Sequence, residues 1–143
     1  ALFAGNGVTA RERDDVEALM SAAGATVWLD QESQMDVVTA ISGSGPAYFF
    51  LLIEALEAAG IAAGLPATTA RRLAVETARG AGLMSAESGE TPTVLREQVT
   101  SKGGTTAAAL EVLEAAAMRD TFGRAVAAAT RRSAQLADEF GGT

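Results

Sequence analysis

Cysteine and histidine are both absent from the 143-residue sequence. Their absence excludes disulfides, thiol nucleophiles, zinc sites of the usual Cys/His type and any mechanism that uses imidazole as acid or base. Aromatic residues make up only 5% of the chain, although 48% of its residues are hydrophobic. The core must therefore be built from Ala, Leu and Val, a composition that favours closely packed helices.

Basic residues are also few, with 11 Lys and Arg against 18 Asp and Glu and a net charge of −7. We expect neither nucleic acid nor an anionic membrane as a partner, because both need a basic surface. The longest apolar run, Ala47–Ile53, is shorter than the roughly 18 residues that a spanning helix requires. No signal peptide is recognisable. These features predict a soluble, cytoplasmic protein.

The first thirty residues read as a β-α-β unit. Ala1–Ala4 is a short apolar run and Ala25–Leu29 is typical of a strand. Between them, Thr9 and Glu12 have the spacing of a capping box at a helix start, and Gly24 suits the end of that helix. We predict one domain over residues 1–30 and another over residues 31–143.

The segment Gly5–Ala10 matches the G-x-G-x-x-A form of a dinucleotide-binding loop, and Asp30 follows about twenty residues later, where a ribose-binding acid belongs. A small NAD-binding protein is therefore one hypothesis. Against it, no further strand is recognisable after Asp30, and two strands with one helix cannot bury both faces of a parallel sheet. The favoured interpretation is the edge of a larger sheet, so that the chain starts inside a domain.

Residues 31–143 are predicted to be helical. A short helix is expected near Asp36–Ile41, followed by a small-residue loop at Ser42–Pro46. Longer helices are then expected at Pro46–Ala59, Ala70–Ala81, Ala107–Met118 and Phe122–Phe140, and a second short helix at Thr93–Thr100. Breaks are expected at Gly60, Gly64 and Pro66, and fraying at Gly141–Thr143. The helix at Pro46–Ala59 is apolar all round, so a partner subunit is expected to cover it. The small residues of Ala70–Ala81 suit either tight packing within the chain or a homodimer interface.

The loop Thr100–Thr106 combines a glycine pair with hydroxyl side chains directly before a helix. Glycines let the backbone approach a ligand closely, and the free N–H groups of a helix N-terminus attract an anion. Ser and Thr are also ordinary helix caps, so a plain cap is the competing interpretation.

Two motifs carry a resemblance to a known family. S-G-S-G-P-A-Y at Ser42–Tyr48 and L-R-E-Q-V-T-S-K-G-G-T-T at Leu95–Thr106 closely resemble pyrroline-5-carboxylate reductase, and the chain resembles the C-terminal half of that enzyme. The resemblance implies a mainly α fold, with a helical dimerisation domain preceded by a short β-α-β remnant of a Rossmann domain. It implies reduction of 1-pyrroline-5-carboxylate to L-proline with NADPH or NADH, in a homodimer that often assembles further. The chain alone would bind no cofactor and would be inactive.

The resemblance also implies the site residues. Backbone N–H groups of a substrate loop would hold the substrate carboxylate, and the Thr106 hydroxyl would act on the ring nitrogen as the catalytic group. The substrate loop comprises Ser101, Lys102, Gly103, Gly104, Thr105 and Thr106, and the active-site wall comprises Ser42, Gly43, Ser44, Gly45 and Pro46.

Three points stay open at this level. Many members of the family have proline where Lys102 stands, so the loop is less rigid here, and Lys102 is expected to be exposed to solvent. Glu87 is a candidate carboxylate near the ring nitrogen. The alternative function is a helical dimerisation module without a ligand site of its own.

Overall fold

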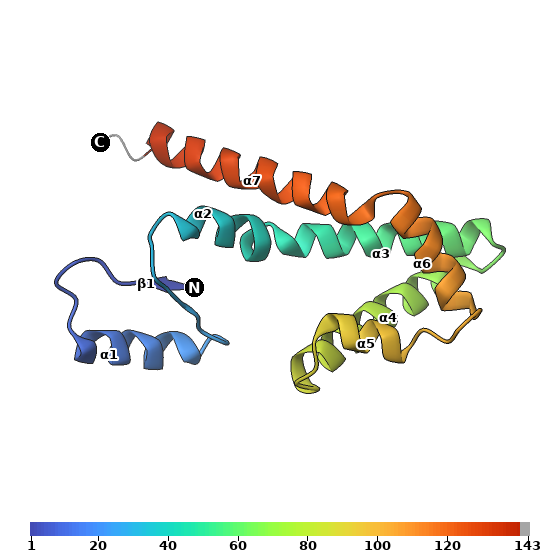
Figure 1. Ribbon diagram of the computed structural model, residues 1–143, viewed down its shortest axis with the longest axis horizontal. Coiled ribbons are helices and arrows are strands. Elements are labelled where there is room, and N and C mark those ends of the chain that lie inside the picture. The colour runs from blue at the N-terminus through green and yellow to red at the C-terminus, as the bar shows by residue number, and fades with distance from the viewer. Residues whose placement is uncertain (141–143) are drawn as a thin grey trace. The chain divides into compact units, whose positions relative to one another are not determined.

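Residues 1–140 are described in the computed structural model, which is mostly helical, as predicted (Figure 1). The predicted fraying of Gly141–Thr143 lies outside these residues. The chain forms two compact units. The first comprises residues 1–44 together with the segment from Arg124 onward, and the second comprises residues 45–123.

The N-terminal β-α-β unit is confirmed. Strand β1 (Leu2–Phe3) pairs in parallel with β2 (Trp28–Leu29), and helix α1 (Ala10–Ser21) connects them. Leu2 lies opposite Trp28 in this register. Among residues 1–140 the sheet has no third strand, in agreement with the sequence.

Polar contacts fasten α1 to the second strand. The Glu17 carboxylate accepts hydrogen bonds from Trp28 Nε1 at 3.0 Å and from Thr26 Oγ1 at 3.1 Å. The Arg13 guanidinium lies 4.3 Å from the centre of the Trp28 ring, in cation–π geometry. The single tryptophan therefore fixes both the helix and the strand of this small unit.

The predicted loop at Ser42–Pro46 is wrong, because the backbone there is helical. Helix α2 (Gln34–Val38) continues into a π-helix at Thr39–Gly43, and after one bend residue the next helix begins at Gly45. Ser44 N donates to Thr39 O at 2.8 Å, an i→i−5 bond, and the Ser42 hydroxyl donates back to Val38 O at 3.1 Å. The small residues are thus accommodated in a widened helical turn rather than in a loop.

Helices α3 (Gly45–Ala62) and α4 (Ala67–Glu87) pack against each other in the second unit. Gly60 was predicted to break the first of them, but α3 runs through it. A Cβ on Gly60 would lie 3.1 Å from the Ala70 Cβ, so the glycine permits close approach of the two helices. The turn after α3 is made at Gly64, which has a φ of +100°.

The close contact between Gly60 and Ala70 also explains the small residues of α4. Ala70 and Ala74 are buried, and Ala70 is the residue that faces Gly60. Tight packing within the chain therefore accounts for these two positions, whereas Leu73 on the same helix is 54% exposed.

Helices α5 (Pro92–Gln98) and α6 (Thr105–Ala115) flank the predicted substrate loop, and α7 (Met118–Phe140) follows. The helix predicted at Ala107–Met118 therefore starts two residues earlier and stops three residues sooner. It stops because Ala117 takes a left-handed φ of +53°. In the first unit, α7 is joined to α2 by the Ser133 hydroxyl, which donates to Asp36 Oδ1 at 2.7 Å.

Helix α3 exposes large apolar side chains, as its composition predicted. Phe49, Phe50 and Leu51 are each more than 60% exposed. Within the helical stretch Gln34–Ala62, an 18-residue window reaches a mean hydropathy of 1.4, so the stretch is long and apolar enough to cross a membrane by length and composition alone. The estimate from the run Ala47–Ile53 therefore understated this stretch, because the π-helix makes it continuous.

Candidate functional site

The loop before α6 uses its two glycines in different ways. Gly103 has a φ of +70°, a conformation that favours glycine over residues with a Cβ. Gly104 is the N-cap of α6, and its N–H donates to Ser101 O at 3.0 Å, which closes a tight turn. A Cβ on Gly104 would collide with the Ser101 hydroxyl and lie 3.2 Å from the Ser101 carbonyl oxygen. The turn therefore requires glycine at both positions.

The N-terminus of α6 carries no side-chain cap. Its first intrahelical bond runs from Ala108 N to Gly104 O at 3.2 Å. Within residues 1–140, the N–H groups of Thr105, Thr106 and Ala107 have no hydrogen-bond acceptor. Gly104 is therefore the N-cap and no Ser or Thr side chain among the described residues caps this helix, which leaves three N–H groups without an acceptor at its positive end.

The residues of the turn differ in their exposure to solvent. Ser101, Lys102 and Thr105 are exposed, whereas Thr106 is partly buried. The exposure of Lys102 agrees with the sequence-based expectation. Glu87, the other open candidate, is exposed at the end of α4, and its role stays a prediction.

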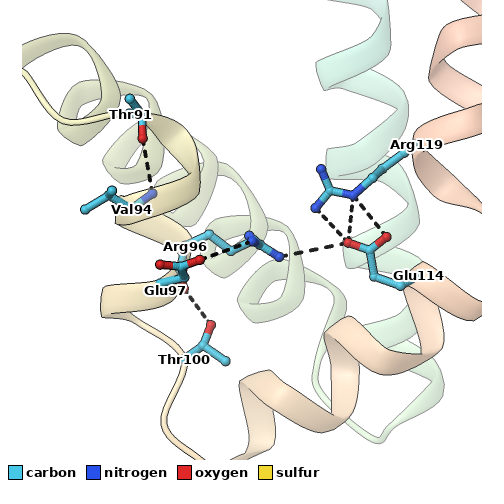
Figure 2. Close-up of polar contacts among 7 residues, drawn as sticks. All are labelled: Thr91, Val94, Arg96, Glu97, Thr100, Glu114 and Arg119. Atoms are coloured by element: carbon cyan, nitrogen blue, oxygen red, sulfur yellow. Dashed lines mark hydrogen bonds and ion pairs between the residues drawn. The ribbon is translucent and has the colours of Figure 1, made fainter.

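An arginine and glutamate network joins α5 and α6, which flank this loop, and the start of α7 (Figure 2). Glu114, in the last turn of α6, accepts from Arg119 Nε at 2.8 and 3.0 Å and lies 2.7 Å from Arg119 Nη2. Arg96 Nη1 of α5 lies 3.9 Å from the same carboxylate. One carboxylate thus links the helix before the loop to the helix after it and to the start of α7.

The network shifts the titration of its members. The hydrogen bonds from Arg119 lower the pKa of Glu114, and the charges of Arg119 and Arg96 act in the same direction. The same hydrogen bonds raise the pKa of the Arg119 guanidinium. Glu114 therefore stays ionised at neutral pH and keeps both arginines as partners.

Arg96 lies within the second family motif, but the sequence alone predicted no role for Arg96, Glu114 or Arg119. Arg96 and Glu114 stand on two helices separated by the loop, so no helical periodicity connects them. A sequence signal does exist, because Glu111 and Glu114 are the only charged residues in the apolar segment Thr105–Met118.

The residues of the predicted active-site wall lie elsewhere in the chain. Ser42 and Gly43 end the π-helix, Ser44 is the bend residue, and Gly45 and Pro46 open α3. Ser42 to Ser44 belong to the first unit, whereas Gly45, Pro46 and the whole loop Ser101–Thr106 belong to the second. Proline is accepted in the first turn of α3 because its missing N–H has no intrahelical role there.

The glycine segment Gly5–Ala10 does not fit a dinucleotide. Thr9 and Glu12 form a complete capping box at the start of α1. Glu12 N donates to Thr9 Oγ1 at 3.3 Å, and Thr9 N donates to Glu12 Oε2 at 2.8 Å. A dinucleotide places its pyrophosphate at such a helix N-terminus. Here the Glu12 carboxylate already occupies that position, and its charge would repel a phosphate.

Comparison with known proteins gives a consistent result. A family model described as pyrroline-5-carboxylate reductase dimerisation matches residues 32–136. A pyrroline-5-carboxylate reductase of Pseudomonas aeruginosa is 46% identical over 140 residues, which cover 98% of this chain and 51% of that protein. One from Arabidopsis thaliana is 46% identical over 132 residues, which cover 92% of this chain and 48% of that protein.

Solved structures agree with the sequence matches. A pyrroline-5-carboxylate reductase from Coxiella burnetii superposes with a TM-score of 0.90 at 40% identity, over 94% of this chain and 50% of that one. A pyrroline carboxylate reductase from Plasmodium falciparum, described with NADP bound, has a TM-score of 0.78 at 33% identity, over 90% of this chain and 49% of that one. The chain thus spans about half the length of the curated relatives it matches.

Proposed function

Because the chain belongs to the pyrroline-5-carboxylate reductase family, we propose that it provides the substrate loop and the dimer interface of an enzyme that reduces 1-pyrroline-5-carboxylate to L-proline. The observation that carries the proposal is the uncapped N-terminus of α6, where three N–H groups have no partner within residues 1–140. The substrate carries a carboxylate, which is the kind of group that such a helix end binds.

The residues of the substrate loop have separate roles in this proposal. The N–H groups of Thr105, Thr106 and Ala107 hold the substrate carboxylate, and the glycine turn at Gly103 and Gly104 lets the five-membered ring approach the backbone. The Thr106 hydroxyl hydrogen-bonds the ring nitrogen. This fixes the imine carbon for hydride attack; the electron pair of the broken C=N π bond moves to the nitrogen, which takes its proton from solvent water. Ser42 to Pro46 are proposed as part of the wall around the reacting ring.

The hydride donor in this proposal is NADPH or NADH, which supplies two electrons and one hydrogen to the imine carbon when bound. The relative from Plasmodium falciparum is described with NADP. No residue of this chain is assigned to the nucleotide, because the capped start of α1 suits no phosphate. Binding of the substrate carboxylate and of the ring nitrogen needs neither histidine nor a metal.

We propose that residues 1–30 correspond to the end of a Rossmann domain and residues 31–143 to the dimerisation and substrate domain. The exposed face of α3 supports a homodimer. Coverage by a second copy would bury side chains such as Phe49 and Phe50, which a monomer leaves in water. Assembly of such dimers into larger oligomers is part of the proposal.

Burial against a second copy of the chain also explains why the stretch Gln34–Ala62 is apolar, so a membrane is not needed to account for it. The family model matches residues 32–136 and therefore includes this whole stretch. We accordingly propose a cytoplasmic enzyme that binds neither membrane nor nucleic acid, in line with the acidic composition.

Replacing Thr106 in the full-length gene product tests the chemistry. Thr106→Ala should lower kcat/KM for the imine by about a hundredfold, because one preorganised hydrogen bond to the reacting nitrogen is lost. Thr106→Ser keeps the hydroxyl and should stay within a few-fold of the wild type. A correctly folded Thr106→Ala protein with normal kcat/KM would show that Thr106 has no such role.

The alternative, a dimerisation module without a ligand site, makes a different prediction. In that case the wild-type full-length protein would form dimers in sedimentation equilibrium but would neither oxidise NADPH in the presence of the imine nor respond to L-proline.

A further inference from the structure

The substrate loop is a bridge between two helices, and its ends are held by different means. At the start, the Thr100 hydroxyl donates to the Arg96 carbonyl oxygen, and Thr100 N donates to Glu97 O at 3.0 Å, so the loop leaves α5 in a fixed direction. At its end the loop enters α6 through Gly104, without a cap. In the described part of the chain, no side-chain cap therefore ties the start of α6 to the loop, and a side-chain contact that fixes the direction of α6 has to be sought further along that helix.

The Glu114 carboxylate is placed to set this direction. It lies between Arg96 of α5 and Arg119 of α7, and Figure 2 shows the two guanidinium groups approaching it from different sides. Glu114 is nine residues after Thr105, which corresponds to roughly 13 Å along the helix axis. A tilt of about 5° around the Glu114 end would thus displace the N–H groups of Thr105 and Thr106 by about 1 Å, and a displacement of that size is enough to damage a binding geometry.

We propose that Glu114 is a positioning residue of the substrate site: its paired contacts with Arg96 and Arg119 hold α6 at the angle at which its N-terminal N–H groups meet the substrate carboxylate. Glu114 touches no substrate in this proposal, which rests on the proposed function of the loop. The backbone joint beside it supports the assignment. Ala117 takes a left-handed φ of +53° between α6 and α7, so the helix direction changes within three residues of the carboxylate.

A pure charge effect and a positioning role predict opposite changes in substrate binding when Glu114 is replaced by Gln. Glu114→Gln removes a negative charge, which by Coulomb's law alone would improve the binding of an anionic substrate. A positioning role predicts the reverse, because the neutral amide loses the charge attraction to Arg96 and keeps only part of its bonding to Arg119. The sign of the effect therefore separates the two explanations.

The experiment measures steady-state kinetics of the full-length gene product with the imine and NADPH. Glu114→Gln should raise KM for the imine about threefold to fivefold, in keeping with partly exposed ion pairs, and should leave KM for NADPH unchanged. The matched control is Glu97→Gln, which removes the same charge from a residue that also lies 3.9 Å from Arg96 but on the same helix. The control should leave KM for the imine unchanged or slightly lower.

A second variant tests the same contact in case Glu114→Gln does not fold. Arg96→Lys keeps the charge but loses the planar fork that reaches Glu114, and it should also raise KM for the imine more than KM for NADPH. An active wild type in which both variants leave KM for the imine unchanged or lower would overturn the positioning role and leave the proposed function intact. A wild type that does not reduce the imine would overturn both.

Discussion

Helices α1 and α6 begin in opposite ways. The first turn of α1 is closed by its own side chains, since Thr9 accepts from Glu12 N while Glu12 accepts from Thr9 N. The first turn of α6 begins at Gly104, has an alanine where α1 has Glu12, and keeps three N–H groups without a partner in residues 1–140.

The difference shows that the residues at a helix N-terminus can either stabilise the helix or leave its N–H groups free to bind an anion. A capping box satisfies the first N–H groups and places a negative charge at the positive end of the helix, so no anion is needed. A glycine N-cap without an acidic third residue gives up that stabilisation and leaves the same groups available to a ligand. The sequence decides this choice at two positions, the N-cap and the third helical residue.

Transferring the acidic residue of α1 to α6 should have the largest effect. Ala107 occupies the third helical position of α6, as Glu12 does in α1. Ala107→Glu should raise KM for the imine at least tenfold, because the introduced carboxylate repels the substrate carboxylate from the same helix end. Steady-state kinetics of the full-length gene product measure the change.

The control for this exchange is Ala107→Gln, which adds the same volume without the charge and should change KM far less. An equal rise in both variants would mean that bulk, not charge, closes the site. An unchanged KM in Ala107→Glu would mean that no anion binds at the start of α6.

Removing the cap of α1 should have a smaller effect, and on stability alone. Thr9→Ala should lower the free energy of unfolding by about 1 kcal/mol, as is usual for the loss of a threonine cap. KM for the imine should stay the same, since α1 has no role in the proposed site. Denaturant unfolding followed by circular dichroism measures the first quantity. Thr68→Ala, at an exposed position in the first turn of α4, is the control.

The smallest expected effect is a pH dependence confined to α1. Hydrogen bonds from the Thr9 N–H and hydroxyl lower the pKa of Glu12 below its ordinary value of 4.5. A carboxylate with a lowered pKa stabilises the folded state above its ordinary pKa, and this stabilisation is lost as the pH falls through the folded value. Amide exchange should therefore show the first turn of α1 keeping its protection from neutral pH down to about pH 4.5 and losing it as the pH falls further, relative to Thr9→Ala. Equal pH profiles in the two proteins would contradict the capping role of Glu12.

Local sequence signals predicted much of this structure. The spacing of Thr9 and Glu12 gave the start of α1 correctly, and the apolar character of residues 46–59 anticipated an exposed α3. The glycine pair before α6 indicated a helix end open to an anion, and the absence of a side-chain cap agrees with that interpretation. These features depend on residues that are neighbours within one helix or one turn, so a sequence pattern can contain them.

The errors occurred where a distant contact or a subtle backbone change decides the outcome. Gly60 has the local signature of a helix break, but its packing against Ala70 keeps it within α3. The small residues at Ser42–Pro46 resemble a loop, whereas a π-helix at Thr39–Gly43, with Ser44 N bonded to Thr39 O, keeps the backbone helical. Ala117 has no signature of a left-handed residue. The link from Arg96 to Glu114 joins two helices across a loop, which no local periodicity records.

The contact between Gly60 and Ala70 has a consequence for how this protein tolerates mutation. In most cores the damaging substitutions remove atoms, because a large side chain leaves a cavity behind. The buried apolar side chains in residues 1–140 are Ala40, Ala70, Ala74 and Leu95, and three of these have only a methyl group to lose. Damage should therefore come mainly from added atoms, which would force α3 and α4 apart. In a mutational scan, the least tolerant buried positions of this chain should be those with the smallest side chains.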